Sequence, residues 1–302
     1  MLVVVLGGGD SPEREVSLRS AKAVADAARA AGFEVVELDP RDGLAALDKL
    51  PKSTVVLPIL HGAGGEDGTL QAELQKRGLP YMGADSRSSK ACFDKWQTRQ
   101  ALTKAGLPMP EGVFVTAETY AAQPLAKRPH VLKVNRGGSS IGTLIVRDPA
   151  KVDARQVQAV FELDKQAILE ELIEGTEITV PVLDQTALTP IEIRPPEGGE
   201  FDYENKYSGV TAELCPPESV SEAVQKQAMK LAERVHKVMG CRHLSRTDLM
   251  IDSGGHSFIL EINPIPGLTA QSLFPKSAAV AGLDMPKLVA RFIAMVKRDY
   301  HL

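Results

Sequence analysis

The sequence predicts an α/β protein whose N-terminal part contains a small parallel sheet. Apolar runs at residues 2–6, 33–38 and 55–60 have the length and the β-branched character of buried strands. Residues 16–31 place small and apolar side chains at helical spacing, and Gly32 follows them as a helix stop. A strand, a helix and a second strand in this order favour parallel pairing, because parallel strands need a crossover connection.

Composition excludes several classes of protein. The 35 Lys and Arg residues are scattered and the net charge is −4, so a nucleic-acid partner, which usually requires a basic face, is not expected. No apolar stretch approaches the ~20 residues of a membrane span, so no membrane partner is expected either. Three widely spaced cysteines, Cys92, Cys215 and Cys241, exclude a fully paired disulfide framework and a zinc motif. These features indicate a protein of the reducing cytoplasm.

Two further units follow the first one. A helix at 88–105 leads into Gly-Leu-Pro-Met-Pro at 106–110, a stiff segment that we interpret as a hinge. The second unit is dominated by strands, predicted at 112–115, 130–135, 143–146 and 167–173. The third unit contains, in order, strands at 178–183 and 189–194, a helix at 219–239, strands at 244–252 and 256–263, and a helix at 285–298. The predicted domains are therefore residues 1–85, 86–176 and 177–302.

A predicted hairpin in the third unit carries the most informative polar cluster. Its two strands are joined by the turn Ser253-Gly254-Gly255 and are expected to pair antiparallel. Because strand side chains alternate faces, Arg246 shares a face with Asp248, and Glu261 shares a face with Asn263. Two carboxylates and an amide oxygen form a hard, all-oxygen set that suits Mg²⁺ bridging substrate phosphates. In the alternative interpretation the face is solvated and the arginine only pairs with the acids, but the apolar neighbours disfavour it.

A glycine-rich loop in the second unit is a candidate phosphate site. Lys133 precedes the segment Gly137-Gly138-Ser139-Ser140-Ile141-Gly142. Free backbone N–H groups and hydroxyls in such a loop can cradle phosphate, and the lysine supplies a point charge. The loop is not a Walker A motif, because the lysine comes before the glycines and no helix follows. A plain hairpin turn would explain the glycines about as well.

Two more loops follow predicted parallel strands, at residues 7–15 and 61–69. Both place glycines and charged groups at the carboxyl ends of these strands, where α/β sheets bind ligands. The first loop lacks the G-x-G-x-x-G spacing, and Pro12 and Glu13 occupy the turn where a pyrophosphate needs bare amides, so a nicotinamide dinucleotide is disfavoured. His61 taken alone is compatible with a structural histidine, and only its loop makes it a candidate.

Together these segments resemble the D-alanine:D-alanine ligases of the ATP-grasp superfamily. The motifs HGAGGEDGT, GGSSIG, YENKY, RTD and EINPIPGLT occur in the family's order, and the resemblance runs from Leu2 to the final helix. It implies a Rossmann-like parallel-sheet domain followed by a two-subdomain ATP-grasp fold with a lid loop at 203–215. It also implies a homodimer formed through the N-terminal unit.

The resemblance further implies an activity. In that family ATP phosphorylates a first D-alanine, and the amine of a second D-alanine attacks the D-alanyl phosphate, which supplies D-alanyl-D-alanine for peptidoglycan precursors. Two Mg²⁺ or Mn²⁺ ions assist, and the residues that match their ligands are Asp248, Glu261 and Asn263. The lysines that match those facing the ATP phosphates are Lys95, Lys133 and Lys206. The inter-domain segment that matches the adenine site consists of Glu170, Glu171, Leu172 and Ile173. The acid that matches the ribose ligand is Glu177.

The same resemblance assigns the amino-acid site. Glu13 matches the residue that receives the first substrate's ammonium, and hydrogen bonds join it in the family to Ser139 and Tyr207. Arg246 and the backbone N–H of Gly267 match the groups that stabilise the developing oxyanion. The residues that match the site for the second substrate's carboxylate are Ser272 and Leu273, with His61 nearby. For the serine, a helix cap is an equally open interpretation.

Two other functions remain open at the level of sequence. The chain would also suit an ATP-grasp ligase with a different acceptor, such as D-serine, D-lactate or another amino acid. Retention of Lys206 and Tyr207 favours an amine nucleophile, because relatives that use D-lactate generally depart at this loop. A non-catalytic ATP-binding module is the second alternative, but such a module would have little reason to keep the full set of charged residues.

Overall fold

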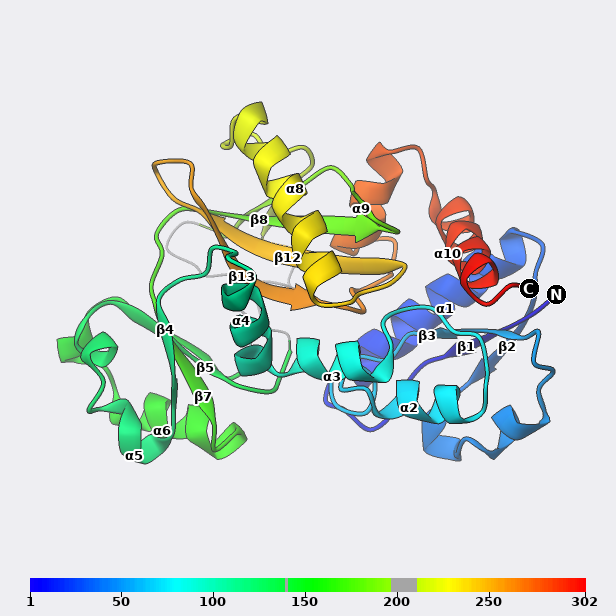
Figure 1. Cartoon of the computed structure of the whole chain (residues 1–302), viewed down its shortest axis with the longest axis horizontal. Helices are drawn as coiled ribbons and strands as arrows, with labels where there is room; N and C mark the ends of the chain where they lie inside the picture. Colours follow the sequence, from blue (N-terminus) through cyan, green and yellow to red (C-terminus); the bar gives the residue numbers. More distant parts are fainter. Residues whose placement is uncertain (139–140, 197–210) are drawn as a thin grey trace.

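We describe the protein from a computed structural model, which covers residues 1–138, 141–196 and 211–302. Three sheets lie along the long axis of the molecule (Figure 1), with the N-terminal sheet at one end, a four-stranded sheet at the other and the largest sheet between them. Within these residues, no helix combines the length and the apolar character that a bilayer crossing requires.

The N-terminal sheet confirms the predicted parallel arrangement. Strands β1 (Leu2–Leu6), β2 (Glu34–Leu38) and β3 (Val55–Pro58) pair in the order β2-β1-β3, and both pairings are parallel. Helix α1 (Arg14–Ala30) crosses over between the first two strands. At the end of β1, a Cβ on Gly7 would lie 2.3 Å from the Cβ of Ala21, so only glycine allows the helix to approach this closely. Two short 3₁₀ helices, Pro40–Asp42 and Ala45–Lys49, lead to β3.

The four-stranded sheet is antiparallel, with the order β4-β7-β5-β6. Its strands are β4 (Gly112–Val115), β5 (His130–Val134), β6 (Thr143–Val146) and β7 (Ala167–Glu171). Helix α6 (Ala154–Leu163), which the sequence analysis missed, packs Val160 and Phe161 into the core of this sheet. The other helical segments of this region are α5 (Ala117–Tyr120) and the 3₁₀ helices Pro124–Lys127 and Pro149–Lys151.

The largest sheet is also antiparallel and has the order β11-β10-β8-β12-β13, with β9 paired to β8. Its strands are β8 (Thr176–Leu183), β9 (Thr186–Ala187), β10 (Ile191–Arg194), β11 (Ala212–Leu214), β12 (Leu244–Ile251) and β13 (Ser257–Asn263). The hairpin of β12 and β13 is as predicted. Helix α8 (Glu222–Val238) covers the sheet by packing its buried alanines and Val235 against β8 and β12.

The single helix predicted at 88–105 is wrong, because two helices occupy this segment. Helix α3 (Ser86–Phe93) ends before Asp94, and α4 (Lys95–Lys104) begins after it. The Asp94 carboxylate accepts from the N–H of Gln97 as the cap of α4 and lies 3.1 Å from the Arg136 guanidinium. Contacts from another part of the chain therefore break a segment whose local periodicity is continuous. Helix α2 (Thr69–Lys76) was likewise not predicted from the sequence.

The chain ends by returning to the N-terminal sheet. Helices α9 (Leu273–Val280) and α10 (Met285–Asp299) follow the largest sheet, and α10 packs on α1. The apolar stripe of α10 was predicted to pack in a core, and it lies in the same core as β1 and β3. Phe292 is fully buried there, with its ring centroid 6.1 Å from that of Phe274. The last helix therefore joins the first and last parts of the chain in one core.

This shared core predicts a large cost for truncating its central aromatic side chain. Phe292→Ala should lower the free energy of unfolding by about 3–5 kcal/mol, because it removes a buried ring and leaves a cavity. Urea unfolding followed by circular dichroism measures this cost. Val280→Ala is the matched control, since its side chain is 54% exposed and should change stability by less than about 0.5 kcal/mol. A cost for Phe292→Ala as small as the control's would show that α10 is not part of the core.

Candidate active site

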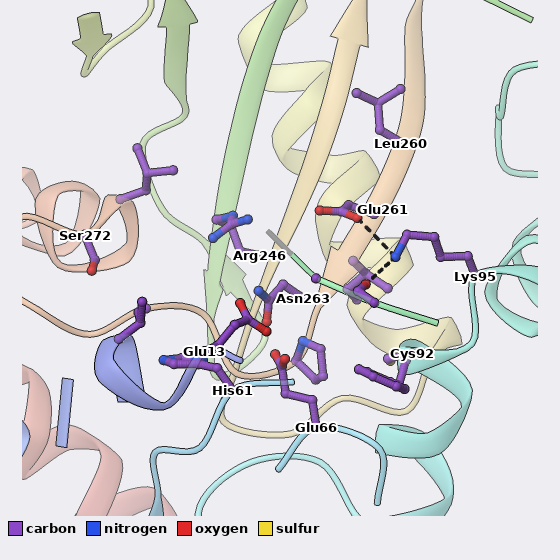
Figure 2. Close-up of a pocket in the computed structure, with 18 of the residues that line it drawn as sticks. Glu13, His61, Glu66, Cys92, Lys95, Arg246, Leu260, Glu261, Asn263 and Ser272 are labelled. Atoms are coloured by element: carbon purple, nitrogen blue, oxygen red, sulfur yellow. Dashed lines mark hydrogen bonds and ion pairs between the residues drawn. The ribbon is translucent and has the colours of Figure 1, made fainter. Parts of the chain in front are cut away.

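One cavity of about 920 Å³ gathers side chains from all three sheets and their loops. Figure 2 shows the labelled side chains around this space, which come from the N-terminal loops, α3, α4, the β12–β13 hairpin and the start of α9. The predicted site residues that line it are Glu13, His61, Lys95, Lys133, Glu170, Arg246, Glu261, Asn263, Gly267, Ser272 and Leu273. The structure thus brings together residues that lie up to 260 positions apart in the sequence.

The hairpin residues share faces as predicted, and the strand register shifts between Asp248 and Leu249. Arg246 lies opposite Asn263, and Asp248 lies opposite Glu261. The guanidinium donates to both oxygens of Asp248, with Nε to Oδ1 at 2.9 Å and Nη2 to Oδ2 at 2.8 Å, and the Thr179 hydroxyl donates to the same carboxylate. Burial disfavours the charged guanidinium, but the Asp248 carboxylate outweighs this effect and raises the pKa of Arg246.

These contacts show where the Asp248 carboxylate lies, and they agree with part of the alternative interpretation of the hairpin. Asp248 is not among the described residues that line the cavity, because its carboxylate turns to Arg246 and Thr179 behind the surface. The arginine does pair with the acid, as the alternative interpretation held. The face is nevertheless not solvated, since Asp248 is only 6% exposed. Thr179 was missed, and only its place on the neighbouring strand β8 identifies it.

The donor set fits a hard divalent cation. Glu261 and Asn263 line the cavity next to each other in β13, and the amide oxygen of Asn263 is oriented by the N–H of Ile265 at 2.9 Å. In the described part of the chain, no three His, Cys, Asp or Glu side chains form a ready metal cage. Carboxylate and amide oxygens that supply only part of a coordination shell suit Mg²⁺, which usually completes its shell with water and substrate phosphates.

Two lysines from different elements face this donor set. Lys95 begins α4, and its Nζ donates to the carbonyl oxygen of Gly137 at 2.6 Å and lies 3.8 Å from Glu261 (Figure 2). Burial lowers the pKa of Lys95, and the Glu261 carboxylate opposes this effect. The Nζ of Lys133, on β5, lies 2.6 Å from Glu170 and 3.1 Å from the carbonyl oxygen of Leu260. The cavity therefore has a cationic wall beside its carboxylates.

Among the described residues that line the cavity, only one belongs to the predicted adenine segment. Glu170 lines it, whereas Glu171, Leu172, Ile173 and the predicted ribose acid Glu177 are not among its described lining residues. The Glu170 carboxylate is 3% exposed and lies between Lys133 and the guanidinium of a residue that the sequence analysis missed, Arg99. Arg99 lies four residues after Lys95, so both cations share one face of α4, and this spacing is the signal by which the sequence could have indicated Arg99.

The N-terminal loops supply the opposite wall. Gly62 and Gly138 allow the Glu13 carboxylate to lie against both loops, because a Cβ on either glycine would come within about 3 Å of Oε2. Glu66 belongs to the motif HGAGGEDGT, but the sequence indicated no role for it. It lines the cavity, and its carboxylate accepts a hydrogen bond from the N–H of Gly62 at 2.7 Å. Burial, with a contribution from Glu13, raises the pKa of Glu66 to about 8, and burial lowers the pKa of His61 to about 4. Both groups are therefore mainly neutral at pH 7.

The C-terminal edge of the cavity contains Gly267 and Ser272. Ser272 occupies the cap position of α9, as one interpretation of the sequence expected, but its side chain makes no capping bond. Its Oγ instead accepts a hydrogen bond from the N–H of Thr269 at 3.1 Å. The same Oγ lies close to Gly267, since a Cβ added to that glycine would be only 2.9 Å from it. The hydroxyl is thus held at the cavity edge. The predicted residues Ser139, Lys206 and Tyr207 lie outside the described residues, as do positions 203–210 of the predicted lid.

The raised pKa of Glu66 predicts how stability varies with pH. The folded state holds a proton that the unfolded state, with a pKa near 4.5, releases, so this contribution is complete below pH 4.5 and is lost as pH rises through about 8. Glu66→Gln should therefore reduce the fall in the free energy of unfolding between these pH values, as measured by urea titrations. The exposed Glu222→Gln should leave the wild-type slope unchanged. Equal slopes in Glu66→Gln and the wild type would mean that Glu66 is ionised in the folded protein.

Comparison with known proteins places these features in one family. The family model described as D-ala D-ala ligase C-terminus matches residues 102–294. The chain is 40% identical over 301 residues to a D-alanine–D-alanine ligase of Nitratidesulfovibrio vulgaris (strain DP4), covering 98% of each chain, and 38% identical over 300 residues to one of Actinobacillus succinogenes, covering 97% of each.

Solved structures agree with the sequence comparison. The D-alanine–D-alanine ligase from Bacillus anthracis gives a TM-score of 0.86 at 30% identity, covering 100% of this chain and 99% of that one. Its complex with ATP gives 0.85 at 28% identity with the same coverage. Since both comparisons span almost the whole length, the three-sheet architecture is that of one family. The chain belongs to the family of D-alanine–D-alanine ligases.

Proposed function

We propose that this chain uses ATP to join two D-alanine molecules into D-alanyl-D-alanine. The observation that carries the proposal is that one cavity has a wall of lysines and hairpin oxygens on one side and the Glu13 carboxylate on the other. The first wall suits the phosphates of a nucleotide, and the second suits the ammonium group of an amino acid. An enzyme that phosphorylates an amino-acid carboxylate must bring these two ligands together.

At the nucleotide end, Lys95, Lys133 and Lys206 would neutralise the phosphates. Residues 170–173 would hold adenine, and Glu177 would bind the ribose. This assignment is supported by the two described lysine ammonium groups, which reach the same wall from α4 and β5. Phosphoryl transfer is catalysed mainly by positioning and charge neutralisation, which fixed cations supply.

Asp248, Glu261 and Asn263 would hold the metal, Mg²⁺ or Mn²⁺. When bound, a divalent ion at this position would neutralise charge on the transferring phosphoryl group. Glu261 and Asn263 already face the cavity, whereas both oxygens of Asp248 are engaged by Arg246. For Asp248 to become a ligand, the arginine would have to share the carboxylate with the ion.

At the amino-acid end, Glu13 would receive the first substrate's ammonium and connect to Ser139 and Tyr207. The first carboxylate attacks the γ-phosphorus of ATP, which forms an acyl phosphate and releases ADP. The neutral amine of the second D-alanine then attacks the acyl carbon and loses a proton. The tetrahedral intermediate that results expels inorganic phosphate. Arg246 and the N–H of Gly267 would stabilise the oxyanion.

The second D-alanine would bind through its carboxylate to Ser272 and Leu273, with His61 nearby. Because His61 and Glu66 are neutral at pH 7, this end of the cavity adds little charge that competes with the substrate carboxylate. We further propose that the product enters peptidoglycan precursor synthesis in the cytoplasm and that the chain acts as a homodimer. A ligase with another acceptor is the second candidate, since Ser272 is held by a loop contact and not by the helix.

Phosphate release from ATP tests the reaction directly. We expect release with D-alanine and none with L-alanine, because the proposed function is specific for the D enantiomer. Mass spectrometry should identify the dipeptide, and D-serine and D-lactate test other acceptors. A dominant product with one of these would reassign the acceptor. Tight ATP binding without turnover on any D-substrate would sink the ligase proposal in favour of a binding module.

The metal assignment predicts the effect of one isosteric change. Glu261→Gln should lower kcat by roughly 10²-fold or more, because it removes a carboxylate from a site that neutralises phosphoryl charge. The fold should persist, since the carboxylate's pairing with Lys95 is loose, at 3.8 Å. Glu111→Gln, which changes an exposed ion pair, is the control and should retain full activity. Near-normal rates in Glu261→Gln would refute the metal assignment.

A further inference from the structure

A buried ion triad forms part of the cavity wall. The Glu170 carboxylate on β7 has Oε1 2.7 Å from Nη2 of Arg99 and Oε2 2.6 Å from Nζ of Lys133. All three residues are less than 10% exposed. The cations hold the pKa of Glu170 below its ordinary value even though burial alone would raise it. The triad is therefore a largely buried set of ion pairs that joins three elements, α4, β5 and β7.

The arginine is itself held on two more sides. Its Nη1 donates to the carbonyl oxygen of Pro110 at 2.8 Å, and its guanidinium packs on Gly112, where a Cβ would lie 2.6 Å from Cζ. Arg99 therefore spans from α4 to the segment that leads into β4 and to β7. A lysine at this position has a single ammonium and cannot hold the carbonyl and the carboxylate in the same planar geometry.

The geometry at Lys133 shows what the triad does. An ammonium has three N–H donors. Two of them are taken, by Glu170 at 2.6 Å and by the carbonyl oxygen of Leu260 at 3.1 Å. Lys133 also lines the cavity, and after these two contacts one donor is left for the space proposed for the ATP phosphates. The position of this donor depends on where the Glu170 carboxylate is fixed.

We propose that Arg99 is a positioning residue that holds Glu170, and through it Lys133, in the orientation that binds the ATP phosphates; this rests on the proposed function of Lys133. With the arginine present, Glu170 shares its charge between two cations and offers Lys133 one oxygen. Without it, both oxygens are free to draw the ammonium away from the cavity. Helix α4 thus supplies Lys95 to the site directly and controls Lys133 from one turn further along.

Steady-state kinetics of Arg99→Met test the proposal. The variant should raise the KM for ATP about tenfold, the size expected for one charge-assisted hydrogen bond, and leave the KM for D-alanine within about twofold. Arg99→Lys should recover part of the loss. Gly112→Ala keeps every charge but displaces the guanidinium, so it should raise the KM for ATP in the same direction. Arg128→Met, which breaks an exposed ion pair with Glu111, should change neither constant.

A double variant separates positioning from a structural role. In a Lys133→Met background, Arg99→Met should add no further increase in the KM for ATP, because the two residues act in series. Additive increases, or a lower Tm with an unchanged KM for ATP in all Arg99 and Gly112 variants, would overturn the proposal. If Lys133→Met itself leaves the KM for ATP unchanged, the proposed phosphate role of Lys133 fails and the inference fails with it. If the KM for ATP rises in Lys133→Met but not in the Arg99 variants, the inference about Arg99 is rejected and the phosphate role of Lys133 stands.

Discussion

The constraint on which the site depends is that each buried charge needs a partner of opposite sign. An uncompensated charge inside a protein costs several kcal/mol, so pairing decides how the cavity side chains are oriented. Arg246 is oriented by Asp248, and Glu170 is oriented by Lys133 and Arg99. In the second set the partners come from different elements. The charges can therefore be buried only when α4, β5 and β7 are correctly packed.

This constraint divides the cavity into two regions with different electrostatics. The hairpin and α4 concentrate full charges, which suit a polyanionic nucleotide and a divalent ion. The N-terminal loops contain ionisable groups that burial keeps neutral at pH 7, namely Glu66 and His61. In the proposed function, a zwitterionic amino acid would meet Glu13 without these two further charges. The two ends differ because opposite charges compensate for burial at one end, whereas burial keeps Glu66 and His61 neutral at the other.

The fold serves the site by holding three sheets around one space. The core that α10 shares with β1 and β3 fixes the N-terminal loops relative to the end of the chain. Glycines let those loops approach: Gly62 and Gly138 leave room for the Glu13 carboxylate, and Gly7 lets α1 pack on β1. The glycine clusters that stand out in the sequence are thus places where backbone comes close to a functional side chain or to another element.

The sequence by itself determined the features that depend on local periodicity. Strand alternation predicted which hairpin residues share a face, and the strand-helix-strand order predicted the parallel sheet; both predictions are correct. Motifs in their order indicated the family, and most of the predicted site residues that are described line one cavity. Such features are readable because neighbouring residues suffice to specify them.

Only the tertiary structure decided which partners the buried charges take. Arg136, 42 residues away, pairs with Asp94 between α3 and α4, and Asp248 turns from the cavity because Arg246 and Thr179 hold it. Arg99 reaches Glu170 across 71 residues. Strand alternation allows the Arg246–Asp248 pair, but local sequence does not specify the partners that other elements bring, because each of these is selected only when packing removes water and leaves a charge that must be compensated.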